Sequence, residues 1–120
     1  MIDGANKYQR YLQGLADGLA SDEAALSGSV TGLLPVGALG VRTRHLIDMA
    51  LAIALSCDDS IEQGVRAAFT AGARVEEITE TVGVAVVMSG GKSLNRAARA
   101  LEVLVNLEEE RAGYAMRSGA

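Results

Sequence analysis

The sequence contains few of the residues that carry redox, metal or aromatic chemistry. Its 120 residues include one cysteine, one histidine, one proline, three tyrosines, one phenylalanine and no tryptophan. One cysteine cannot form a disulfide within the chain, and the single histidine has no second histidine or cysteine at metal-ligand spacing. We therefore expect no internal disulfide, no metal ion and no cofactor.

Basic residues are outnumbered and scattered, with eleven Lys and Arg against fifteen Asp and Glu and a formal net charge of −4. This distribution lacks the basic stripe of a nucleic-acid-binding protein. The apolar runs are too short to span a bilayer, and the first residues, MIDGANKYQR, lack the charged-then-apolar order of a signal peptide. Together with the single cysteine, this predicts a cytoplasmic protein with no nucleic-acid and no membrane partner.

Apolar residues make up 49% of the chain, and most are Ala, Leu, Val and Ile. Small aliphatic side chains let helices pack closely, so the composition favours an all-α bundle over an aromatic-rich β-sandwich. The length suits one domain with a real core, and we predict a single domain over residues 1–120. An Ala- and Val-rich helix over 78–88 leaves more apolar surface than a lone bundle of this size covers, which predicts a homo-oligomer.

Apolar residues recur at helical spacing in several segments, which predicts about five or six helices. The expected helices cover residues 5–19, 22–34, 41–55, 59–71, 75–89 and 93–110. The last one ends in Glu108–Glu110, whose carboxylates oppose the helix dipole, so we expect its end to fray. Seven of the fourteen glycines lie in the first 40 residues, which predicts a variable N-terminal part, 1–40, before a core of 41–110.

Two of these helices carry more specific packing predictions. Nearly every face of the 41–55 helix is apolar, so we expect it at the centre of the fold. In the 93–110 helix the residues expected to face inward are Leu94, Ala97, Ala98, Leu101, Leu104 and Val105. Before that helix, SGGKS imitates part of a phosphate-binding loop, but the motif needs a glycine where Val86 stands. We interpret this glycine pair as a break between two helices.

The stretch from Ala50 to Gly72 places the cysteine where one helix ends and the next begins. At a helix N-terminus the unpaired N–H groups and the dipole favour a thiolate, whereas the carboxylates of Asp58 and Asp59 disfavour it. The sequence leaves open which effect is larger. The alternative interpretation of Cys57 is a small, half-buried structural thiol.

The run RHLIDMALAIALSCDDSIEQGVRAAFTAGARVEEITETVGVAVVMSGG resembles the alkylhydroperoxidase D-like branch of the carboxymuconolactone decarboxylase family. The pattern of that branch contains Gly-Cys-x-x-Cys and a histidine four residues after the second cysteine. The residues in register with the pattern are Arg44, Leu46, Ile47, Cys57, Ile61, Ala68, Gly72, Ala73, Glu76, Glu77, Ile78, Gly90 and Gly91. The resemblance implies an alkylhydroperoxidase D-like helical bundle that assembles as a trimer or hexamer.

Three of the four catalytic positions of that pattern are changed. Cys57 is the first cysteine, but Ser60 replaces the second cysteine and Gly64 replaces the histidine. His45 replaces a glutamate twelve residues before the first cysteine. Ser60 cannot form a disulfide, and without a base at Gly64 it is not activated as a nucleophile. An internal dithiol mechanism is therefore excluded, which leaves a one-cysteine cycle through sulfenic acid.

His45 has two interpretations. Asp48 lies three residues further on the same helical face and would hold the ring of a structural histidine. The resemblance instead places His45 where the family's proton relay to the thiols begins. The candidate catalytic residues are thus Cys57, Ser60 and His45.

Three functions remain open on the sequence. The first is a divergent, one-cysteine peroxidase or thiol oxidoreductase, with a small thiol or another subunit as the resolving partner. The second is lactone decarboxylation, as in the members that give the family its name. The third is a non-redox oligomeric module that binds a small apolar ligand or a partner protein. The reactivity of Cys57 separates the first function from the third.

Overall fold

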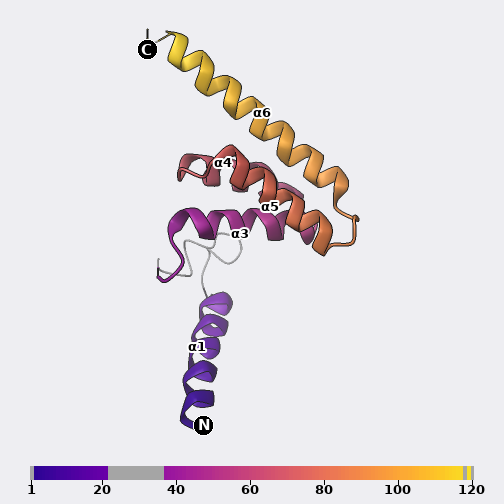
Figure 1. Cartoon of the computed structure of the whole chain (residues 1–120). Helices are drawn as coiled ribbons and strands as arrows, with labels where there is room; N and C mark the ends of the chain where they lie inside the picture. Colours follow the sequence, from indigo (N-terminus) through magenta and orange to yellow (C-terminus); the bar gives the residue numbers. More distant parts are fainter. Residues whose placement is uncertain (1, 22–36, 118, 120) are drawn as a thin grey trace. The chain divides into compact units, whose positions relative to one another are not determined.

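The computed structural model describes residues 2–21, 37–117 and 119, and all regular secondary structure in these ranges is helical (Figure 1). The helices are α1 (Ile2–Ser21), α3 (Val41–Ala54), α4 (Asp58–Thr70), α5 (Val75–Met88) and α6 (Leu94–Arg117). The predicted all-α class is confirmed. The helix expected over 22–34 lies outside the described residues. The chain divides into two compact units, Met1–Ala38 and Leu39–Ala120.

Helix α1, in the first unit, confirms the amphipathic helix expected over 5–19 and extends it at both ends. Its large apolar side chains are exposed, with Tyr8 at 67%, Leu12 at 61% and Leu19 at 57% of their full accessibility. Gly14 lies in mid-helix with no atom near the position that a Cβ would occupy. Burial of its apolar stripe therefore does not explain why α1 is helical. The helix propensity of its residues and their amphipathic spacing do.

The second unit is a bundle of the four helices α3 to α6. Helix α4 lies between α3 and α6 (Figure 1), and α5 packs on both α3 and α6. Its fully buried large side chains come from three helices and the α5–α6 turn. They are Met49, Ile53, Ile61, Val65, Ile78 and Ser93. The inward face of α4 was predicted from the sequence, since Ile61, Val65, Ala68 and Phe69 are all buried.

Helix α3 is less enclosed than its composition predicts. It buries Met49, Ala52 and Ile53, but Leu51 is 51% and Leu55 68% exposed. Helix α3 contacts all three other helices of the unit, as the prediction of a central helix requires. The exposed Leu51 and Leu55 show that part of its apolar surface nevertheless lies at the surface of the unit.

The prediction for α6 needs two corrections. The helix does not end near Glu110 but continues to Arg117. Contacts with α4 hold this part, because Arg66 Nη2 lies 3.8 Å from Glu110 Oε1 and the Arg111 guanidinium lies 3.9 Å above the Phe69 ring. The inward face was also partly misassigned: Leu94, Ala98 and Val105 are exposed. The buried residues are Ala97, Ala100, Val103, Leu104 and Leu107.

Three helices of the second unit end in the same way. In each, an N–H beyond the helix bonds a carbonyl five residues back: Cys57 to Ala52 at 2.9 Å, Ala73 to Ala68 at 3.0 Å, and Gly91 to Val86 at 3.0 Å. The residue before each donor has a positive φ, 65° at Ser56, 95° at Gly72 and 69° at Gly90. This left-handed ending is a Schellman motif. It confirms the predicted helix break at Gly90–Gly91 and places Cys57 directly after such a turn.

Candidate functional site

Cys57 occupies the junction between α3 and α4 that the sequence predicts. Its N–H closes the end of α3, and its carbonyl accepts the Ser60 N–H at 2.9 Å in the first turn of α4. Cys57 is thus the N-cap residue of α4. The side chain is exposed, and its Sγ donates a long hydrogen bond of 3.9 Å to the Leu55 carbonyl. Backbone hydrogen bonds on both sides fix the thiol in an accessible position.

Ser60 and Gly64 follow Cys57 on α4 at one-turn intervals, but their surroundings differ. Ser60 is half-buried in the first turn. Gly64 is buried where α4 crosses α3, and a Cβ added there would lie 3.2 Å from Met49 Cα and 3.3 Å from Met49 Cβ. At these distances Met49 would have to give by a few tenths of an ångström to admit even a methyl group. A histidine at this position would therefore require α3 and α4 to shift.

His45 and Asp48 are both half-buried on α3. Burial raises the pKa of Asp48 above its ordinary value, and the nearby charge of His45 opposes this rise without cancelling it. The two residues therefore interact electrostatically, and the hold of Asp48 on the His45 ring stays a prediction.

An open groove of about 1330 Å³ runs along α4, and His45 lines it from α3. Helix α4 contributes acidic and basic side chains to its wall, and the beginning of α6 contributes two arginines. The charged lining residues are Asp58, Asp59, Glu62, Arg66, Arg96 and Arg99. Cys57 is absent from the lining. The structure thus brings His45 together with charged residues of α4 and α6, and the thiol stands outside this groove.

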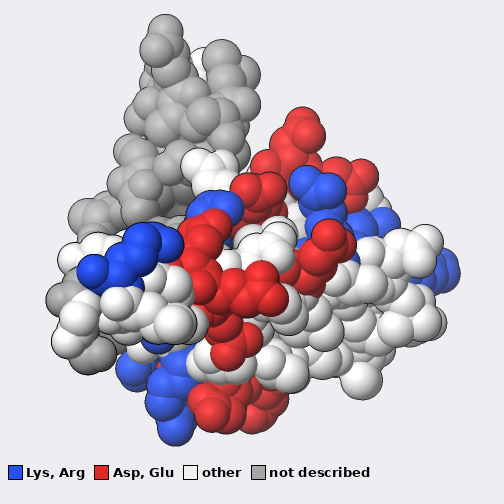
Figure 2. All heavy atoms as spheres, turned by 90° about the horizontal axis from the view of Figure 1, so that it is seen from above, with Lys and Arg blue, Asp and Glu red and all other residues white. Residues whose placement is uncertain are grey.

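Arginines of the groove were not singled out from the sequence. Arg96 Nε donates to the Ile53 carbonyl at 2.6 Å, so a cation stabilises the C-terminal end of α3. Glu62 lies between two arginines, 3.1 Å from Arg66 Nε and 3.9 Å from Arg99 Nη2. Acidic and basic side chains also gather side by side on the face seen in Figure 2. The three-residue spacing of Arg96 and Arg99 on one helix was the available sequence signal.

Comparison with known proteins places the chain in a family. Residues 7–103 match the model of the carboxymuconolactone decarboxylase family. The chain belongs to this family. It is 36% identical over 91 residues to a Paracoccus denitrificans protein described as uncharacterized protein 4 in cox locus, an alignment covering 76% of this chain and 81% of the other. No solved structure matches the chain.

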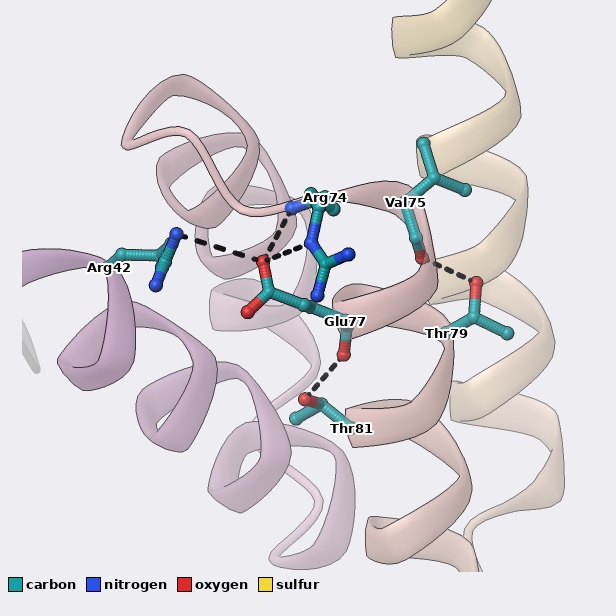
Figure 3. Close-up of polar contacts among 6 residues, drawn as sticks. All are labelled: Arg42, Arg74, Val75, Glu77, Thr79 and Thr81. Carbon is teal, nitrogen blue, oxygen red and sulfur yellow. Dashed lines mark hydrogen bonds and ion pairs between the residues drawn. The ribbon is translucent and has the colours of Figure 1, made fainter.

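Glu77, one of the residues in register with the carboxymuconolactone decarboxylase pattern, fixes the start of α5 (Figure 3). Its Oε1 accepts the backbone N–H of Arg74, the N-cap residue, at 2.8 Å. The same oxygen lies 3.5 Å from Arg74 Nε and 4.0 Å from Arg42 Nη1 at the start of α3. The hydrogen bond from the backbone of Arg74, helped by the two guanidinium groups, lowers the pKa of Glu77. Glu77 therefore connects α3 and α5.

No group of three or more His, Cys, Asp or Glu residues within residues 2–21 and 37–117 is arranged to hold a metal ion. Among the helices described, none is long and apolar enough to cross a membrane. The features that remain for function are the Cys57 junction and the charged groove.

Proposed function

We propose that this carboxymuconolactone decarboxylase family protein is a divergent member of the alkylhydroperoxidase D-like branch that acts as a one-cysteine peroxidase or thiol oxidoreductase. This proposal rests on the exposed thiol of Cys57 at the N-cap of α4. An internal dithiol cycle has no second thiol, since the chain has one cysteine. The close packing of Gly64 against Met49 supports the loss of that cycle, because a histidine there would force Met49 to move.

The proposed cycle begins when the Cys57 thiolate attacks one oxygen of a hydroperoxide. The O–O bond breaks, the sulfur is oxidised to sulfenic acid, and an alcohol leaves after taking up a proton. A small thiol then displaces water from the sulfenic acid and forms a mixed disulfide. A second thiol releases Cys57 and leaves as part of a small disulfide. His45 and Ser60 are the groups proposed to assist, and no cofactor takes part.

The test is hydroperoxide consumption in the presence of a small thiol. We expect turnover by the wild type, its loss in Cys57→Ala, reduced turnover in Ser60→Ala, and its retention in the control Thr43→Ala, a substitution of an exposed residue of α3. Turnover that survives Cys57→Ala would place the chemistry elsewhere. Wild-type protein without turnover, and without sulfenic acid trapped by dimedone, would refute the redox function.

The second candidate is a non-redox oligomeric module that binds a small apolar ligand or a partner protein. It is supported by the exposed apolar side chains of α5, where Val84 is 54%, Val87 76% and Met88 79% accessible. Residues of this kind occur at protein interfaces more than on isolated monomers. The homo-oligomer, as a trimer or hexamer, is proposed for either function. A redox-silent protein that remains oligomeric would favour this candidate.

A further inference from the structure

Helix α1 carries an apolar stripe that the one-cysteine function does not use. Tyr8, Leu12, Leu15 and Leu19 lie along one side of the helix, and all but Leu15 are more than half exposed. They follow one another at steps of four, three and four residues. This is the spacing of the a and d positions of a coiled coil. The stripe is therefore suited to pair with another helix.

The charged side chains of α1 that the structure describes lie away from this stripe. Lys7 and Arg10 occupy other faces of the helix, as does Asp17, which accepts a hydrogen bond of 2.9 Å from Gln13. Two copies of the stripe can therefore meet without burying a charge or opposing like charges at the seam. A neutral seam of this kind fits a second copy of the same helix.

We propose that α1 pairs with α1 of a second copy, in antiparallel orientation, through this stripe. Reversing one helix about the centre of the stripe brings Tyr8 opposite Leu19 of the second copy and Leu12 opposite Leu15 of the second copy. The alternating steps make the stripe self-complementary under this reversal, so four apolar layers form.

Charge selects the antiparallel orientation over the parallel one. The first half of the helix holds Lys7 and Arg10 against Asp3, a net charge of +1, whereas the second half holds Asp17, a net charge of −1. Antiparallel helices place the basic half of one copy beside the acidic half of the other. Their dipoles point in opposite directions, which is also the favourable arrangement. Parallel pairing would bring like halves together.

The orientation can be tested with single cysteines introduced into the full chain. In a Cys57→Ser background, Leu12→Cys and Leu15→Cys are prepared, one of them with a size tag, then mixed and mildly oxidised. A disulfide forms only when the two Cα atoms lie within roughly 7 Å of each other. We expect a several-fold excess of the mixed disulfide over either homodimeric disulfide, because Leu12 faces Leu15 of the second copy.

Gln13→Cys is the matched control, since it lies at the same height on the outer face. Crosslinking of Leu12→Cys with Leu15→Cys no greater than that of Gln13→Cys with Leu15→Cys would overturn the pairing. A predominance of the two homodimeric disulfides would overturn the antiparallel orientation. Circular dichroism of each variant checks that α1 remains helical. Because the variants lack Cys57, the result does not depend on the proposed peroxidase function.

Discussion

Individual positions in the second unit are constrained by backbone geometry that the side-chain pattern does not reveal. Gly64 has a neighbouring helix backbone within 3.2 Å of its missing Cβ, whereas Gly83 on α5 has open space there. Ser56 has a φ of 65°, the conformation in which Gly72 and Gly90 stand at the ends of two other helices. This geometry determines whether a substitution at each position raises or lowers the free energy of unfolding.

We predict that Gly64→Ala and Gly83→Ala change stability in opposite directions. Gly83→Ala should raise the free energy of unfolding by about 0.5–1 kcal/mol, because alanine loses less backbone entropy in a helix. Gly64→Ala should lower it by about 1 kcal/mol or more, because the methyl group overpacks against the backbone of Met49. Urea denaturation of both variants tests this. Stabilisation by Gly64→Ala would mean that α3 and α4 separate easily and that a histidine could be accommodated.

We predict that Ser56→Gly stabilises the protein by about 0.5 kcal/mol. A side chain in the left-handed conformation costs about 1–2 kcal/mol, and the greater freedom of glycine in the unfolded chain offsets part of the gain. The control is Ser60→Gly, which should destabilise because Ser60 lies within helix α4. A loss of stability in Ser56→Gly, measured by the same denaturation, would contradict this account of the turn.

At the scale of elements, helix ends decide where chemistry can be placed. The end of α3 is closed by the turn at Ser56 and by Arg96, and the start of α5 is closed by Glu77. These contacts join α3 to α5 and α6. Arg96 also lines the groove. One side chain therefore both binds the end of α3 and forms part of the groove wall.

We predict that Glu77→Gln destabilises the protein at neutral pH and that the difference from wild type shrinks in acid. The folded state lowers the pKa of Glu77, so its carboxylate contributes stability above the usual glutamate pKa of about 4.3. That contribution is lost as the pH falls through the lower pKa of the folded state. Thermal unfolding of wild type and variant from pH 7 to pH 3 measures it.

The control for this experiment is Glu76→Gln, which removes an exposed carboxylate from the same first turn of α5. Its melting temperature should change less at pH 7. A gap between wild type and Glu77→Gln that stays constant down to pH 3 would show that the carboxylate charge of Glu77 does not act on stability.

At the scale of the whole molecule, the proposed oligomer depends on apolar surface outside the core. We predict that Val84→Glu with Val87→Glu lowers the mass found by light scattering, because buried carboxylates without partners would oppose assembly. The control Met116→Glu, an 82% exposed residue near the end of α6, should leave the mass unchanged. A wild-type mass of 12.4 kDa at micromolar concentration would refute the oligomer itself.

Much of the helical architecture was predictable from the sequence. The spacing of Ile61, Val65 and Phe69 determined the inward face of α4, and Gly72 and Gly90 marked the left-handed ends of α4 and α5. The position of Cys57 at a junction between helices was equally visible. These features are local, because they depend on periodicity and on the backbone conformations that glycine allows.

Tertiary structure decided the features that depend on neighbouring helices. The continuation of α6 beyond Glu110 depends on contacts with Arg66 and Phe69, which lie some forty residues earlier in the chain. The sequence shows that Gly64 stands where the family has a histidine, but only the distance to Met49 shows that a side chain there would force its neighbour to move. The groove that joins His45 to Arg96 and Arg99 likewise exists only because α3, α4 and α6 pack together. Periodicity within one helix cannot specify which side chain of another helix it will meet.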